Sequence, residues 1–115
     1  MKDRELCFKY KGKELKLNLK ECNFFERFRG LMFRKKSFSD CLLFDFKKPV
    51  LWSIHSFFVN FDFIAIWLDD KNNVIETKKV KPFIFRIKPK QKFSKLVEIP
   101  MTKQNKNMIQ NLVEK

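Results

Sequence analysis

The stretch Phe63-Ile64-Ala65-Ile66-Trp67-Leu68, with the polar segment 69–73 and the residues 74–80 that follow it, decides the fold. Six consecutive apolar residues suit the length of a strand, and the lack of polar alternation is typical of a strand buried on both faces. The polar segment after them is typical of a turn. We therefore predict an antiparallel hairpin in which 63–68 form a central strand and 74–80 return beside it.

The flanking segments also have the period-two pattern of strands. Residues 5–10 and 14–20 alternate apolar and polar side chains around a turn at Gly12, which predicts an opening hairpin. Residues 41–46 predict a strand that ends at Lys47-Lys48-Pro49, and residues 93–99 predict a final strand ended by Pro100. Phe83, Phe85 and Ile87 alternate as well, so we expect them to share a strand face in the core.

Two segments have helical spacing instead. Asn23 and Glu26 resemble a capping box before apolar residues at helical intervals, which predicts a short helix over 24–31. Residues 104–113 predict a second short helix with a narrow apolar stripe. We expect one domain over 1–115, of α+β class and β-rich, with a barrel-like or rolled sheet, because closure removes exposed strand edges.

Composition limits the classes of function. The chain has 115 residues, fifteen Phe, two Gly and a net charge of +13, a field that attracts nucleic acid, anionic surfaces or acidic partners. Two glycines do not make a Gly-rich phosphate loop, and neither HExxH nor EF-hand spacing occurs, so we expect no metal and no cofactor. No apolar run has the length of a membrane-spanning helix, so we expect no membrane partner.

The cysteines predict a reducing compartment. Cys7, Cys22 and Cys41 are odd in number, have no CxxC spacing and accompany a single histidine, His55. This pattern fits neither a disulfide framework nor a zinc site, and we expect three unpaired thiols. The first sixteen residues show no apolar signal segment, so we expect a cytoplasmic protein.

Several blocks together resemble a known family. FERFRGLMFRKK (25–36), CLLFDF (41–46), the segment 54–76, VKPF (80–83) and KLVEIP (95–100) are similar in order and spacing to the prokaryotic domain of unknown function 192, and the chain looks like its archaeal members that lack a secretion signal. The resemblance covers about residues 17–100. It implies a compact β-rich domain with an exposed groove, and it implies no enzyme class.

The chain departs from the family pattern at one place. Relatives usually have Pro, an aliphatic residue and Asp before the apolar strand, whereas this chain has Asp62-Phe63-Ile64. Asp62 lies two residues from the family's acidic position, about 6.6 to 6.8 Å along a strand. Any chemistry that depends on that acid is therefore in doubt here.

The leading hypothesis is a binding module for an unknown small ligand or protein partner. Trp52 follows Pro49 at the edge of a strand and is a candidate stacking surface, whereas Trp67 is expected in the core. His55 is a candidate ligand contact, or a half-buried polar ring. The candidate groove residues are Trp52, His55, Phe57, Arg29, Met32 and Arg34. Arg29 and Arg34 either bind an anionic group or pair with Glu26 or Asp45.

Two other hypotheses remain open. The segment 78–95 carries eight basic residues, no acidic residue and interleaved phenylalanines, which favours weak nucleic-acid binding. Its basic residues are Lys78, Lys79, Lys81, Arg86, Lys88, Lys90, Lys92 and Lys95. The other hypothesis is an enzyme in which His55 acts as a base beside an acid from elsewhere, although no catalytic constellation is evident in the sequence.

Overall fold

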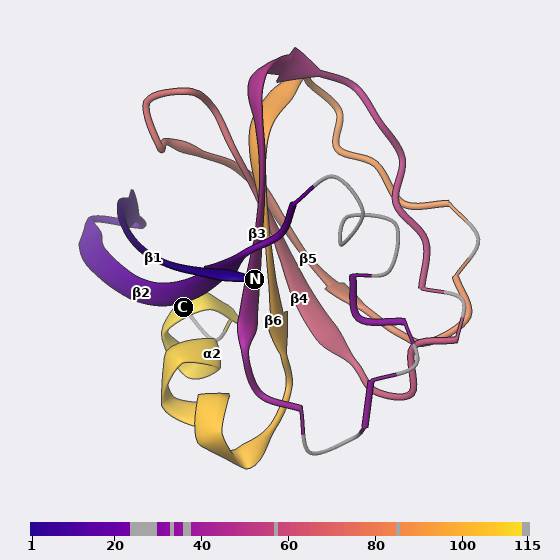
Figure 1. Ribbon diagram of the computed structural model, residues 1–115. Helices are drawn as coiled ribbons and strands as arrows, with labels where there is room; N and C mark the ends of the chain where they lie inside the picture. Colours follow the sequence, from indigo (N-terminus) through magenta and orange to yellow (C-terminus); the bar gives the residue numbers. More distant parts are fainter. Residues whose placement is uncertain (24–29, 33, 36–37, 57, 85, 114–115) are drawn as a thin grey trace.

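The protein, seen in a computed structural model, is built around a strongly curled sheet (Figure 1). The structure describes residues 1–23, 30–32, 34–35, 38–56, 58–84 and 86–113. Within them the strands are β1 (Lys2–Tyr10), β2 (Lys13–Glu21), β3 (Cys41–Val50), β4 (Phe63–Leu68), β5 (Val74–Val80) and β6 (Phe93–Pro100). Their order across the sheet is β1-β2-β3-β6-β4-β5, and only the β2–β3 pair among these strands is parallel.

The curl of the sheet brings its two edge strands towards each other. Lys9 of β1 forms an isolated bridge with Asn73, which immediately precedes β5. The Tyr10 hydroxyl also lies 3.4 Å from the Thr77 hydroxyl of β5. The sheet is thus a six-stranded half-barrel, and the prediction of a rolled sheet is confirmed in this form.

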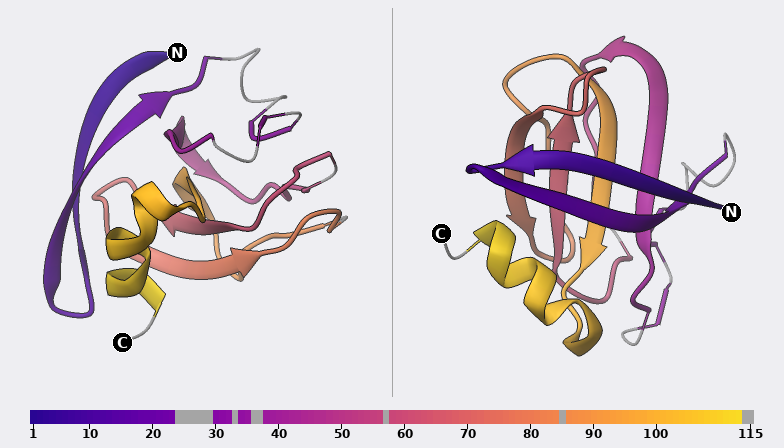
Figure 2. Two further views of the ribbon diagram at one scale, coloured as in Figure 1. Left: turned by 90° about the horizontal axis from the view of Figure 1, so that it is seen from below. Right: turned by 90° about the vertical axis from the view of Figure 1, so that its left-hand side faces the viewer.

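The two faces of the sheet are covered differently. A 3-10 turn (Lys103–Asn105) and the helix α2 (Lys106–Val113) lie on the same side as the β1–β2 hairpin. The described residues of two loops, 51–56 with 58–62 and 81–84 with 86–92, lie on the other side (Figures 1 and 2). Ile109 of α2 packs in a core cluster with Leu6, Leu17 and Ile66. A second cluster under the loops contains Phe44, Phe63, Trp67 and Phe93. This second cluster forms the floor of the candidate site.

The central hairpin and the opening hairpin are confirmed. Strand β4 pairs antiparallel with β5, and all six of its residues are buried, including Trp67. In β1 and β2 the alternating apolar side chains face the core, and Gly12 takes a φ of +80° in the turn. The helix expected over 24–31 falls mainly on residues 24–29, outside the described residues. The C-terminal helix occupies the expected segment.

Two sequence predictions were wrong. Strand β3 does not end before Lys47 but continues to Val50, because a bulge between Asp45 and Val50 accommodates Pro49 without requiring its missing N–H. Phe83 is not in the core: it lies in a turn with a φ of +62° and is 59% exposed. Ile87 is buried and pairs with Ile54 outside the named strands, and Phe85 lies outside the described residues.

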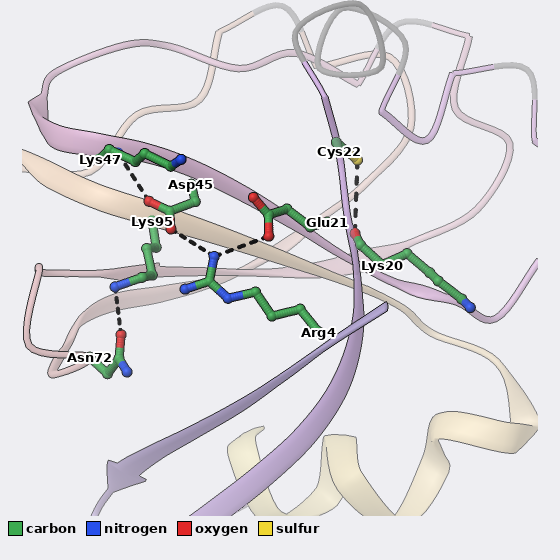
Figure 3. A network of polar contacts seen from close by, with 8 residues as sticks. All are labelled: Arg4, Lys20, Glu21, Cys22, Asp45, Lys47, Asn72 and Lys95. Atoms are coloured by element: carbon green, nitrogen blue, oxygen red, sulfur yellow. Dashed lines mark hydrogen bonds and ion pairs between the residues drawn. The ribbon is translucent and has the colours of Figure 1, made fainter. Parts of the chain in front are cut away.

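A polar network fastens the hairpin to the rest of the sheet (Figure 3). The Arg4 guanidinium of β1 donates to Asp45 Oδ2 of β3 at 2.8 Å and to Glu21 Oε1 of β2 at 3.1 Å. Burial alone would raise the pKa of Asp45, but hydrogen bonds from Arg4 and from the Lys47 amide lower it below its ordinary value. The network therefore connects three strands through one guanidinium.

Candidate ligand-binding site

A cavity of about 340 Å³ lies between the sheet and the loops that cover its second face. Most of its wall is apolar, with five aromatic rings among the lining side chains. The described lining residues are Gly30, Leu31, Met32, Phe44, Phe46, Trp52, Ser53, Ile54, His55, Val59, Phe63, Phe93, Leu96 and Glu98. A volume of this size fits the lower range of pockets for small molecules.

Trp52 lies at the mouth of the cavity. Its ring is packed edge-on against Phe46 with the ring centroids 5.0 Å apart, and 55% of the residue is exposed. Phe46 in turn packs edge-on against Phe93 of β6, at 5.6 Å. Phe46 thus supports the Trp52 ring on one side, while much of the surface of Trp52 remains accessible.

The segment that carries Trp52 and His55 is held by a buried serine. The hydroxyl of Ser56, which has no exposed surface, donates to the Lys81 carbonyl at 2.6 Å and accepts from the Ile84 amide at 2.7 Å. Its backbone carbonyl also accepts from the Phe83 amide at 2.8 Å. These bonds, with the Ile54–Ile87 backbone pair, join the two loops and fix the cavity mouth.

The wall of the cavity carries an acidic residue that sequence reasoning missed. Glu98 of β6 is only 5% exposed and lies opposite Leu42 of β3 and Ala65 of β4 in the sheet register. Burial in apolar surroundings raises the pKa of Glu98 to about 8. The sequence signal was available, because an acid interrupts the apolar run Leu96-Val97-Glu98-Ile99 of a predicted strand.

Gly30 forms the wall opposite this carboxyl group. Its φ is +50°, a conformation that residues with a Cβ rarely adopt. A Cβ on Gly30 would lie 3.5 Å from Glu98 Oε1 and 3.5 Å from the Phe44 ring. The glycine of the RGLMFR block therefore lets the backbone pass close to Glu98.

The structure brings only some of the predicted groove residues together. Trp52, His55 and Met32 line the cavity. Arg34 does not line it: its Nε donates to the Gly30 carbonyl at 3.3 Å and its guanidinium lies 4.6 Å from the centre of the Phe38 ring. Arg29 and Phe57 lie outside the described residues, so their placement stays a prediction.

Three cations of the basic segment 78–95 have partners within the protein. Lys95 is buried and its ammonium group donates to Asn72 Oδ1 at 2.8 Å. Lys78 pairs with Glu76 at 3.4 Å and Lys79 with Asp62 at 3.9 Å. The exposed cations that remain lie on the 81–92 loop: Lys81, Arg86, Lys88, Lys90 and Lys92.

Three other kinds of feature are absent from the described part of the chain. There, no group of three or more His, Cys, Asp or Glu side chains has the arrangement of a metal site. No disulfide joins Cys7, Cys22 and Cys41, all of which are described, and burial raises the pKa of Cys41 to about 12. No helix among the described residues is long and apolar enough to cross a membrane.

Two solved structures show the same fold. A proposed transcription regulator from Sinorhizobium meliloti 1021 has a TM-score of 0.74 at 15% identity, over 92% of this chain and 84% of that chain. A protein of unknown function from Novosphingobium aromaticivorans has a TM-score of 0.74 at 12% identity, over 92% and 78%. At these identities the likeness concerns the fold alone.

The sequence comparisons concern the family. UPF0127 protein PF1050 from Pyrococcus furiosus is 31% identical over 91 residues, which are 78% of this chain and 78% of that protein. The model of the family DUF192, described as an uncharacterized ACR, matches residues 8–111. The match includes every block that carried the resemblance, and the chain belongs to the DUF192 family.

Proposed function

We propose that this protein is a binding module that holds a small, mostly apolar ligand in the cavity beneath Trp52. The observation that carries the proposal is an apolar cavity of about 340 Å³ with one accessible ring at its mouth and one buried carboxyl group in its wall. Apolar walls with a few placed polar groups are the usual form of a small-molecule site. We also propose a cytoplasmic location, since three thiols suit a reducing compartment.

The cavity mouth has features of a site held in a prepared conformation. Phe58 and Phe83 both adopt left-handed backbone conformations, with φ of 59° and 62°, on the two loops that Ser56 joins. Such conformations cost free energy in residues with a side chain and persist where the surrounding contacts enforce them. A mouth that is already ordered loses less entropy when a ligand binds.

The test is an amide-resolved NMR titration with a set of small aromatic compounds that differ in charge. Compounds that bind should shift the amide signals of cavity residues such as Gly30, Ile54 and Leu96. Trp52→Ala should weaken binding at least tenfold, about 1.4 kcal/mol, because it removes the stacking surface. Phe83→Ala is the matched control, since this exposed ring does not line the cavity.

The outcome that would overturn the proposal is equally direct. If compounds bind without shifting the cavity amides, or if Trp52→Ala and Phe83→Ala weaken binding equally, the cavity is not the site. Shifts confined to residues 86–92 would point to the exposed loop instead.

The second candidate is an association with single-stranded nucleic acid through the 81–92 loop. One observation favours it: the exposed Phe83 ring lies between Lys81 and Arg86, and both cations are exposed. A ring among cations supplies stacking and phosphate contacts. The pairing of Lys78 and Lys79 and the burial of Lys95 leave fewer cations for phosphates, so we expect only weak, salt-sensitive binding.

A further inference from the structure

The carboxyl group in the cavity has no partner of its own within the described part of the chain. Glu98 donates or accepts no hydrogen bond and forms no ion pair among those residues. A buried carboxyl group normally has such partners, because the loss of water is otherwise uncompensated. A ligand that pairs with this carboxyl group would therefore offset the free-energy cost of burying it.

The walls around this carboxyl group suit one kind of ligand group. The cavity presents the rings of Phe44, Phe46, Trp52, Phe63 and Phe93. Ring faces attract cations through their quadrupole, and the attraction is stronger where water is excluded. Rings together with one carboxylate form a typical receptor for an organic ammonium group.

We propose that the ligand of this cavity is an organic cation, an ammonium group attached to an apolar body, with Glu98 as its counter-ion. This inference rests on the proposed function and adds the chemical class of the ligand. The apolar body fills the space between the rings and Leu96, and the ammonium group lies against the Glu98 carboxylate. An anionic ligand is excluded by the same carboxylate when it is ionised.

A cation fits this site better than a neutral hydrogen-bonding ligand. A neutral ligand gains one hydrogen bond from the protonated carboxyl group, and the net contribution of such a bond is modest. A cation gains the attraction of an ionised carboxylate in a desolvated place, with ring contacts in addition. The net charge of +13 opposes the approach of cations, but salt screens exposed charges beyond about 8–10 Å much more than a buried pair.

Within the described part of the chain, few other titratable groups face Glu98. Among the described cavity residues, His55 is the other one. On the neighbouring strands, β4 has no titratable side chain, Asp45 of β3 pairs with Arg4, and Lys95 of β6 donates to Asn72. Cys22 lies in the core cluster on the same face of the sheet. The proton released on cation binding should therefore come from Glu98. A contribution from His55 is the alternative that the experiment must exclude.

The inference is tested by calorimetry with benzyltrimethylammonium, a cation that does not titrate, and with benzyl alcohol as the neutral probe. Cation binding should release up to one proton per complex at neutral pH, because the carboxyl group is protonated before binding and ionised after it. The released proton is detected as a difference in enthalpy between phosphate and Tris buffers. Affinity for the cation should rise about tenfold between pH 7 and pH 9.

Two variants assign the proton and keep the two proposals apart. Glu98→Gln should abolish proton release and weaken the cation at least tenfold, and it should weaken benzyl alcohol much less than the cation. His55→Gln should leave proton release intact. Release that disappears in His55→Gln and persists in Glu98→Gln would overturn the inference.

The probes also separate failure of this inference from failure of the proposed function. If benzyl alcohol binds in the cavity and the cation binds no more tightly at any pH, the organic-cation inference is wrong and the binding proposal stands. If neither probe shifts the cavity amides, and the wider aromatic set fails as well, both are wrong. Thermal unfolding of each variant confirms that the fold is retained.

Discussion

Replacing Glu98 by Gln should change how folding stability depends on pH. The pKa of Glu98 is about 8 in the folded protein, against an ordinary value of 4.5. Between these values the folded state holds a proton that the unfolded state releases, so wild-type stability falls as pH rises through this window. Glutamine does not ionise and removes this contribution.

The magnitude follows from the same two values. Each pH unit between them contributes about 1.4 kcal/mol, so wild type should lose about 3 kcal/mol between pH 5 and pH 8 through Glu98 alone. General charge repulsion also changes with pH, so the informative quantity is the difference between Glu98→Gln and wild type. That difference should shift by about 3 kcal/mol in favour of the variant at the higher pH.

Urea unfolding followed by tryptophan fluorescence, under reducing conditions at both pH values, measures this difference. Glu14→Gln is the matched control, because Glu14 is an exposed carboxyl group on β2. A stability difference between Glu98→Gln and wild type that is the same at pH 5 and pH 8 would refute the reasoning. It would mean that the carboxyl group ionises near its ordinary pKa and is therefore hydrated or paired.

Three further predictions concern the sheet, the cavity mouth and the basic loop. Arg4→Met should lower the free energy of unfolding by about 2 kcal/mol at neutral pH, because it removes the ion pair with Asp45. The cost should be smaller near pH 3, because the pKa of Asp45 is lowered in the folded protein and the ion pair is lost when Asp45 is protonated. Urea titrations at both pH values measure this difference. Ser56→Ala should cost about 2 kcal/mol and speed hydrogen exchange of the Ile84 amide, whereas Ser53→Ala should do neither. Wild type should bind single-stranded RNA only at about 10⁻⁴ to 10⁻⁶ M at physiological salt in filter-binding assays; a nanomolar, sequence-dependent affinity would contradict this. Replacing Lys88, Lys90 and Lys92 by Glu should abolish this weak binding.

The sheet was largely predictable because burial leaves a direct mark on the sequence. Strands β1 and β2 have a period-two pattern because one face of each is buried. Strand β4 has an unbroken apolar run because both of its faces are buried. The bulge of β3 leaves no such mark. In the sequence, Pro49 predicts the end of a strand. The pairing of Val50 with Phe93 in the structure shows that the strand continues beyond it.

The candidate site was harder to predict because it depends on strand order. Nothing local in the sequence places β6 between β3 and β4, and that position puts Glu98 in the cavity wall. The prediction for Phe83 failed for a related reason. Alternation around Pro82 resembled a strand. The backbone there is instead held by bonds to Ser56, which lies 27 positions earlier in the sequence, and the Phe83 ring is exposed.

Neither Asp62 nor Ile64, where this chain departs from the family pattern, lines the cavity. Ile64, at the position where relatives usually have an acid, packs in the cluster with Leu6 and Ile109, on the opposite face from the cavity. Asp62 lies 3.9 Å from the Lys79 ammonium group and does not line the cavity. Neither position brings a carboxylate to the ligand space.

The acid that reaches the cavity comes from the neighbouring strand. Glu98 lies directly opposite Ala65 in the β4–β6 register, and both belong to the face that the loops cover. Alanine is the smallest side chain of β4, so it leaves room for the carboxyl group beside Phe44 and Gly30. Because successive residues of a strand face opposite sides of the sheet, an acid at position 64 would be directed away from this cavity. The carboxyl group of the cavity wall therefore comes from β6, and the absence of an acid at position 64 does not remove it.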